Sequence, residues 1–430
     1  MEFGWSFSCE KATSPNIIFE TFDSDLYHVE KNRFELLSNE EHKKYNSFDT
    51  FFEEKNSIAI NNLNKEYLKI KEEIDAQLAH GRELEVLPVD FIMQEKTMLD
   101  VLSSFEDVNY IKYVYKMKKT QVRGTGLNTE SATVLMKCIR QGRNLLETGQ
   151  NSHVLTKPLI DFYAATAYAY ALIVINSPLH KSLDSLSKSH GHTYNHRNKI
   201  IEFGGDLPRG TFIELLCSIP LAYLDAGNEL IITYSLLESI DKVQNHNIKL
   251  SLLTMLSMVP ELRSYYSKVD NDHKLTHETR IDTKTRGKDV TYTFYIGNGE
   301  FKPDLERLKK SFRTEVIKEN HGSYEVTLSA DDISKIMPNF YQDIRGDLYY
   351  VDSPLDGVVI PEVCLHFLII SALCNIMRYS PHEWSDILNN KVSPDFSLLI
   401  SRYLRLFEQK FPMIIIQYLS NYRPIMQFQR

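Results

Sequence analysis

The stretch 143–175, RNLLETGQNSHVLTKPLIDFYAATAYAYALIVI, decides how this chain of 430 residues folds. Its first residues, up to about Glu147, have the composition of the end of a helix, and a polar turn follows. A second helix is predicted to begin near Thr156, to hold Pro158 in its first turn and to stop before Pro178. This second helix is apolar or tyrosine-rich on nearly every face, and such a helix must be buried. The stretch therefore predicts a helical hairpin at the centre of the core.

The residues before the hairpin predict three further elements. Asn128 or Thr129 is suited to cap the first helix of the hairpin, after a loop at Gly124-Thr125-Gly126. Residues 61–80 have apolar side chains at three- and four-residue spacing, which indicates an amphipathic helix. In residues 108–123, aromatic or branched residues alternate with lysines, which predicts a strand with one solvated face.

The residues after the hairpin change character twice. A polar loop is predicted over 180–210, and helices over 211–265. Residues 268–358 are more polar and contain short alternating runs, which predict strands at 290–298, 323–329 and 347–353. From Ile360 the chain is predicted to be helical to its end. The β-rich part therefore interrupts two helical parts that we expect to pack together.

These elements predict a mainly α fold, with a multi-helix core, a small β-rich insert and a mixed N-terminal region. Four parts are expected along the chain: a mixed α/β region, a first part of the helical core, the insert and a second part of the core, at 1–125, 126–267, 268–358 and 359–430. The helices would pack around residues 154–175 and 361–378.

The composition is that of an ordinary globular protein in a reducing compartment. Apolar residues make up 43% of the chain and charged residues 25%, with a net charge of −8. The acidic balance argues against a polyanion-binding surface over the whole chain. The five cysteines form no C-x-x-C pair. We find no signal peptide, and the longest uncharged run is too short and too polar to span a bilayer. We expect a cytoplasmic protein.

Three histidines in the run HGHTYNH, at positions 190, 192 and 196, form the most site-like cluster of the sequence. On a helix His192 and His196 would share a face and could chelate zinc. Gly191 and Asn195 disfavour a helix, however, and no glutamate completes an H-E-x-x-H motif. We therefore predict a polar loop or an anion contact around His190, with no metal and no cofactor.

Arg378 and His382 invite comparison with the R-x(4–6)-H signature of HEPN ribonucleases, in which an arginine and a histidine on one helix activate a ribose 2′-hydroxyl. Here the spacing is one residue short, and Pro381 interrupts the helix between them. Arg143 and His153 form a second pair, but a predicted turn separates the two. A general base must first satisfy geometry. A metal-independent ribonuclease is therefore an alternative rather than the main prediction.

A run of cationic residues interleaved with tyrosines offers a nucleic-acid contact. Phosphates could meet the cations while bases stack on the rings. Lysines on a surface strand also discourage edge pairing, which is the simpler account of the run. The residues are Lys112, Lys116, Lys118, Lys119 and Arg123.

Several short motifs occur in an order and spacing that resemble one protein family. They are Gly142-Arg143-Asn144, KPLIDFYA at 157–164, His190-Gly191, MVPEL at 258–262, Pro361-Glu362, Met377-Arg378-Tyr379, Trp384, Ser393-Pro394-Asp395 and Phe411-Pro412. In these motifs the chain resembles the YaaC-like family of uncharacterised bacterial proteins, over 135–265 and 360–420. The family supplies no established activity, so the resemblance implies a fold and a bacterial origin. The family tends to have an acidic or aromatic residue after its Arg-Tyr pair. Here Pro381-His382 follows, which weakens a catalytic role for His382.

We expect a non-catalytic binding or interaction protein that meets a protein partner or a second copy of itself, and no membrane. Its recognition surface would join the loop 180–210 to the helix near Arg143, where cationic groups could hold an anionic ligand. The residues expected to bind this ligand are Arg143, Asn144, His190, His192 and Arg197. The alternative is a HEPN-type effector of an antiviral-defence or toxin module that cleaves RNA with Arg378 and His382, or with Arg143 and His153.

Overall fold

The computed structural model describes residues 5–8, 18–21, 85–90, 94–118, 127–176, 186, 189–207, 210–225, 231–270, 275–287, 289–298, 302–420 and 422–427. The amphipathic helix predicted at 61–80 lies outside these residues, as do Lys119 and Arg123 of the cationic run.

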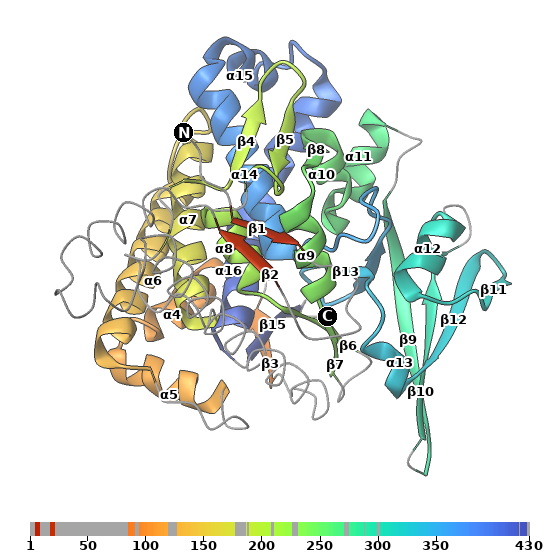
Figure 1. Cartoon of the computed structure of the whole chain (residues 1–430). Helices are drawn as coiled ribbons and strands as arrows, with labels where there is room; N and C mark the ends of the chain where they lie inside the picture. Colours follow the sequence, from red (N-terminus) through yellow and green to blue (C-terminus); the bar gives the residue numbers. More distant parts are fainter. Residues whose placement is uncertain are drawn as a thin grey trace, which may run out of the picture.

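The predicted hairpin is confirmed as helices α6 (Thr129–Gln150) and α7 (Lys157–Asn176), which lie side by side in Figure 1. Asn128 caps α6, because its side-chain oxygen accepts a hydrogen bond from the Ser131 amide at 2.7 Å. Most of α7 is buried, as its apolar composition requires.

Gly142 lets the two helices of the hairpin approach closely. A Cβ atom at this position would lie 2.7 Å from the ring of Tyr168, whose side chain is fully buried. That distance is well inside van der Waals contact, and the ring has no solvent to move into. The glycine is therefore a requirement of the packing between α6 and α7.

Gly142→Ala is expected to destabilise the protein by about 1–3 kcal/mol through overpacking against Tyr168. The loss should appear despite the gain of about 1 kcal/mol in helix propensity. Thermal and urea unfolding would measure it. The matched control is Asn144→Ala on the exposed face of the same helix, which should be neutral or stabilising. A Gly142→Ala protein as stable as wild type would contradict the close packing.

Helices α14 (Glu362–Tyr379) and α16 (Pro394–Leu419) pack against α7 and complete the core. Phe162 of α7 and Phe367 of α14 have ring centroids 5.6 Å apart. Lys157 and Glu408 form a buried ion pair between α7 and α16. Residues separated by 200 positions thus meet, as predicted for the two helical parts. Each large apolar side chain buried here contributes about 1.5–3 kcal/mol.

Two of these helices, α7 and α14, are long and apolar enough to cross a membrane by length and composition alone. In the structure 78% of the apolar window of α7 and 72% of that of α14 is buried inside the chain. That burial is the arrangement of core helices, because the rest of the chain already covers their apolar faces.

A six-stranded antiparallel sheet stands beside the helical part in Figure 1. Its order is β11-β12-β10-β9-β14-β13. The strands are β9 (Thr276–Arg286), β10 (Asp289–Ile296), β11 (Ile317–Asn320), β12 (Ser323–Ser329), β13 (Asn339–Gln342) and β14 (Leu348–Val351). Phe294, Phe340 and Tyr350 of the sheet pack with Phe312 of helix α12 (Leu305–Phe312). The three predicted strands of this region are confirmed as β10, β12 and β14.

Four smaller sheets show that the prediction of a mainly α fold with a small β insert is wrong. They pair β1 (Trp5–Ser8) with β2 (Ile18–Thr21), β3 (Glu85–Asp90) with β15 (Tyr422–Gln427), β6 (Leu221–Asp225) with β7 (Ile231–Ser235), and β4 (His192–Asn195) with β5 (Ile200–Phe203) and β8 (Ile248–Ser251). The fold is mixed α and β. These strands have only four to six residues, too few to show a period distinct from that of a short helix.

The remaining described helices are short. They are α4 (Gln94–Ser104), α5 (Val108–Lys118), α8 (Thr211–Cys217), α9 (Leu237–Asn245), α10 (Leu252–Ser257), the 3-10 turn η2 (Pro260–Leu262), α11 (Arg263–Val269), α13 (Ala330–Ile333) and α15 (Pro381–Leu388).

Four local predictions are therefore corrected. The region predicted to be helical over 211–265 contains the strands β6, β7 and β8 as well as helices, because the short strands carry no pattern distinct from that of a short helix. The strand predicted at 108–123 is the helix α5, because Ile111 and Val114, three residues apart, are the positions that it buries. The loop predicted at 180–210 contains the strands β4 and β5. The segment predicted to be helical to the chain end finishes with β15, which pairs in parallel with β3.

Candidate functional site

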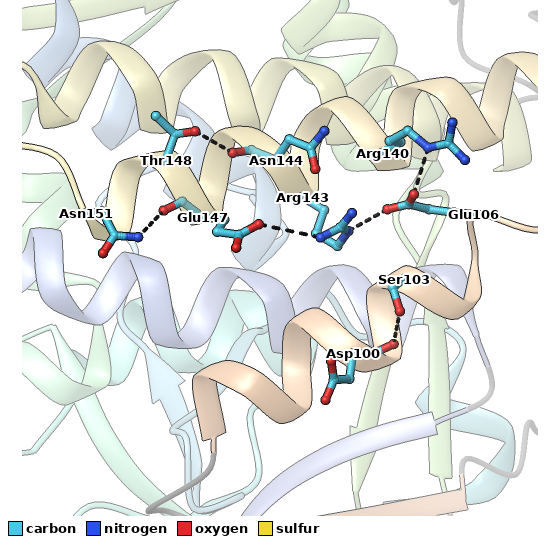
Figure 2. A network of polar contacts seen from close by, with 9 residues as sticks. All are labelled: Asp100, Ser103, Glu106, Arg140, Arg143, Asn144, Glu147, Thr148 and Asn151. Carbon is cyan, nitrogen blue, oxygen red and sulfur yellow. Dashed lines mark hydrogen bonds and ion pairs between the residues drawn. The ribbon is translucent and has the colours of Figure 1, made fainter.

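Arg143 lies in a network of charged side chains at the junction of α6 and the turn between α4 and α5 (Figure 2). Its Nε atom and the Nε atom of Arg140 each donate to Glu106, the latter at 2.7 Å. Its Nη1 atom also lies 3.6 Å from a carboxylate oxygen of Glu147. Burial raises the pKa of Glu106, but the hydrogen bonds from Arg143 and Arg140 outweigh burial and hold this pKa below its ordinary value.

This network changes the expected role of Arg143. Its charge is already matched by carboxylates, and no contact joins it to His190 among the described residues. Asn144 is exposed on α6, and no contact joins its side chain to Glu106 in Figure 2. His153 lies in the turn after α6, where its Nδ1 atom accepts a hydrogen bond from the Leu155 amide at 3.2 Å. The described structure joins neither Asn144 to His190 nor Arg143 to His153.

His192 is held on both sides. Its Nδ1 atom donates to the His190 carbonyl oxygen at 3.1 Å, so its Nε2 atom accepts from the Ser371 hydroxyl at 2.6 Å. Burial, and then the neighbouring His190, lower the pKa of His192 to about 4. The ring is therefore neutral at pH 7 and links strand β4 to the middle of α14. Within the described ranges, no three His, Cys, Asp or Glu side chains gather as metal ligands.

The cationic group beside His190 is Arg378, at the end of α14. Burial and the nearby Arg378 charge both lower the pKa of His190. The Arg378 guanidinium lies 5.0 Å over the ring centroid of Tyr379, whose side chain is 60% exposed. The Tyr379 ring also contacts that of His196, with the ring centroids 5.6 Å apart. We call Arg378, Tyr379, His190 and His196 the Arg378 corner.

Two polar groups, one within this corner and one beside it, lack hydrogen-bond partners among the described residues. The Nδ1 atom of His196 and the hydroxyl of Tyr194 are buried and unpaired, and the two rings are 4.9 Å apart. Buried polar groups without a partner are uncommon and often mark the place of a water or an ion. Arg197 is exposed in the turn between β4 and β5, close in sequence to these groups.

The proposed ribonuclease pair is split between two helices. Arg378 lies in the last turn of α14 and His382 in the first turn of α15, and Ser380 separates the helices. Both side chains are exposed, and no hydrogen bond or ring contact joins them in the described structure. The ribonuclease alternative gains no supporting contact from this arrangement.

The described part of the cationic run, Lys112, Lys116 and Lys118, lies on a helix rather than on a strand. Lys112 and Lys116 are four residues apart on α5 and share a face. The Lys112 ammonium donates to the Thr129 hydroxyl at 2.6 Å. Lys118 ends the helix. The account of these lysines as edge-strand residues therefore does not apply, and the nucleic-acid contact stays a prediction.

A pocket that the sequence did not reveal opens between the β6–β7 hairpin, the end of β13 and α16. Its cavity volume is about 80 Å³, and it is partly open to solvent. At one side the Lys410 ammonium lies between Glu362 and Glu261, 2.9 Å from the latter. Burial lowers the pKa of Lys410, but the two carboxylates outweigh burial and raise it above its ordinary value. We call these three residues the Glu–Lys–Glu triad.

Backbone amides at the end of β13 complete the triad. The Ile344 amide donates to Glu261 at 3.0 Å, and the Gln342 amide donates to Glu362. The triad thus joins the six-stranded sheet to α16 and to the starts of η2 and α14. The sequence marks these positions, although no site was predicted at them. Pro260-Glu261 and Pro361-Glu362 are both among the motifs that carry the family resemblance. Lys410 directly precedes a third such motif, Phe411-Pro412.

Comparison with known proteins gives a family. The family model described as YaaC-like protein matches residues 100–419, which is 320 of the 430 positions. The chain belongs to the YaaC-like family, as its motifs indicated. No curated protein and no solved structure matches the chain.

Proposed function

We propose that this YaaC-like protein is a non-catalytic binding protein that recognises an anionic ligand at the Arg378 corner. The observation that supports the proposal is Arg378 itself. This exposed guanidinium has no carboxylate within ion-pair distance among the described residues, whereas Arg143, the cation first expected here, has two. An arginine free of carboxylates can turn its planar group of donors to a phosphate or a carboxylate.

The surroundings of Arg378 favour a phosphate that carries a planar ring. Tyr379 offers an exposed aromatic face, and bases stack on such faces with about 1–3 kcal/mol each. His190, whose pKa is lowered, is neutral at pH 7 and can donate one N–H hydrogen bond to an oxygen. The unpaired Nδ1 atom of His196 adds a second polar group beside the ring.

Arg378→Ala is expected to weaken binding of adenosine monophosphate by about 10- to 100-fold, because a hydrogen bond to a charged group contributes about 1.5–3 kcal/mol. Isothermal titration calorimetry would measure the loss. The matched control is Arg402→Ala on α16, which removes a guanidinium that lies 5.5 Å over the ring of Tyr265. That variant should bind like wild type.

Two further probes separate the parts of the ligand. Adenosine tests the ring without the phosphate, and inorganic phosphate tests the anion without the ring. Tyr379→Ala should affect the nucleotide and leave inorganic phosphate unchanged. The proposal fails if wild type binds none of the anions at millimolar concentration, or if Arg378→Ala binds them equally well. Cleavage of RNA by wild type but not by Arg378→Ala would instead support the ribonuclease alternative.

A further inference from the structure

The pocket beside the Glu–Lys–Glu triad is formed by other segments than the Arg378 corner. Its charged side chains have a net negative charge, whereas the Arg378 corner is positively charged. We propose that it is a second binding site, which takes a small ligand with one protonated amine attached to an apolar or aromatic body. In this proposal Glu362 holds the amine, and the aromatic side chains of the pocket surround the body of the ligand.

The first argument is the charge of the pocket. Glu261 and Glu362 share the single ammonium of Lys410, so the triad keeps one negative charge without a partner of its own whenever Glu362 is ionised. Two more charged side chains line the pocket, Asp343 and Arg423. Three carboxyl groups therefore meet two cations.

The carboxylate of Asp343 and the guanidinium of Arg423 carry opposite charges, so these two side chains leave the charge imbalance of the triad unchanged. Among its contacts, Arg423 donates to the side-chain oxygen of Gln342 at 3.1 Å and to the Gly346 carbonyl at 3.4 Å. Asp343 accepts from the backbone amides of Arg345 and Asp347 in its own turn. A ligand cation would complete the pairing inside a low-dielectric site, where an unpaired charge is costly.

The second argument is the aromatic lining. Tyr223, Tyr234, Phe340, Tyr341 and Tyr418 all line the pocket. The hydroxyls of Tyr234 and Tyr341 donate to the carbonyl oxygens of Pro338 and Ile360. Burial raises the pKa of both hydroxyls, so they stay neutral. Aromatic groups attract cations by about 0.5–2 kcal/mol each when the cation is desolvated.

The third argument is the protonation of Glu362. Burial raises its pKa to about 7; Lys410 acts against this shift, while Glu261 adds to it. Near pH 7 the carboxyl therefore carries a proton part of the time. When an ammonium group binds, the carboxyl must give this proton to solvent and pair as a carboxylate. Binding of the amine is thus coupled to release of up to one proton, and it should tighten as the pH rises from 6 to 8.

The test uses the full chain and a series of primary amines from methylamine to 2-phenylethylamine, each against the alcohol of the same shape. We expect the larger amines to bind at least tenfold more tightly than their alcohols. Titration in buffers of different ionisation enthalpy should detect the released proton. Amine affinity that is independent of pH between 6 and 8, or alcohols that bind as well as the amines, would overturn the proposal.

Two variants locate the site. Glu362→Gln keeps the shape of the side chain and should abolish both the preference for amines and the proton release. Asp343→Asn should weaken amine binding by a few fold and keep the proton release, since Glu362 remains. Circular dichroism would confirm that each variant is folded. If Glu362→Gln binds amines with the same release of protons, the amine does not pair with Glu362, and the proposal is wrong.

Discussion

Replacing Lys410 with methionine is expected to lower the free energy of unfolding by about 3–5 kcal/mol at pH 8, because removal of one partner leaves buried charges uncompensated. Lys410 is only 3% exposed, and its ammonium separates the carboxylates of Glu261 and Glu362. Without the ammonium these two groups face each other in a desolvated site. Urea unfolding of wild type and variant would measure the difference.

The size of this loss should depend on pH. The folded-state pKa of Glu362 is raised above the ordinary value of 4.5 to about 7, so between these values the folded chain binds more protons than the unfolded chain. The contribution of Glu362 to stability therefore falls as the pH rises through this window. Removing Lys410 raises the pKa further, so Lys410→Met should be milder at pH 5 than at pH 8.

A triple variant provides the control for Lys410→Met. Changing Glu261 and Glu362 to glutamine in the same chain removes the charges that the lysine compensates, and most of the lost stability should return. A single variant that loses less than about 1 kcal/mol at pH 8 would contradict a structural role for the triad.

Trp384→Ala is expected to cost about 3–5 kcal/mol, as for other buried aromatic residues. The indole of Trp384 is 2% exposed and packs between α15 and the hairpin turn, where its N–H donates to the Leu155 carbonyl at 3.1 Å. Trp384→Phe keeps most of the ring and should lose about 1–2 kcal/mol, mainly the hydrogen bond. Thermal unfolding would rank the two.

The control for Trp384 lies close by. Tyr379 is also aromatic but is 60% exposed at the end of α14. Tyr379→Ala should change stability by less than about 0.5 kcal/mol. If the two alanine variants were equally stable, the indole would not be the anchor that attaches α15 to the hairpin.

The helical hairpin could be predicted because its signals are local. Asn128 caps the helix that it precedes, and Pro158 is suited to the first turn of the next helix. The apolar run after Pro158 is stable only when it is buried in the core. The strands β10, β12 and β14 were also readable from their own alternation. In each case the information lies within a few residues of the element.

The other elements depend on contacts with distant segments of the chain, and no local sequence pattern indicates these contacts. In α5 the tyrosines and lysines alternate over a few residues, and only packing shows that Ile111 and Val114 face the core. Strand β15 contains Pro424, and its sequence was predicted to continue the preceding helix. Only its pairing with β3 shows that it is a strand. Sequence-local reasoning could place neither.

The candidate sites follow the same rule. His190 was predicted to be near a cation, but the fold supplies Arg378 instead of Arg143. Glu261, Glu362 and Lys410 come from three segments, and the sequence does not show which charged residues are buried. Only the family motifs next to them marked these positions in advance.

The parallel pairing of β3 with β15 has a consequence for how the protein is made. More than 300 residues separate the two strands, so at about 5–20 residues per second a ribosome needs tens of seconds to supply the partner of β3. During that time residues 85–90 present an open strand edge, which is a template for wrong pairing and aggregation. The pairing of β3 with β15 therefore comes late in folding. We expect the nascent chain to rely on chaperones until residues 422–427 have emerged.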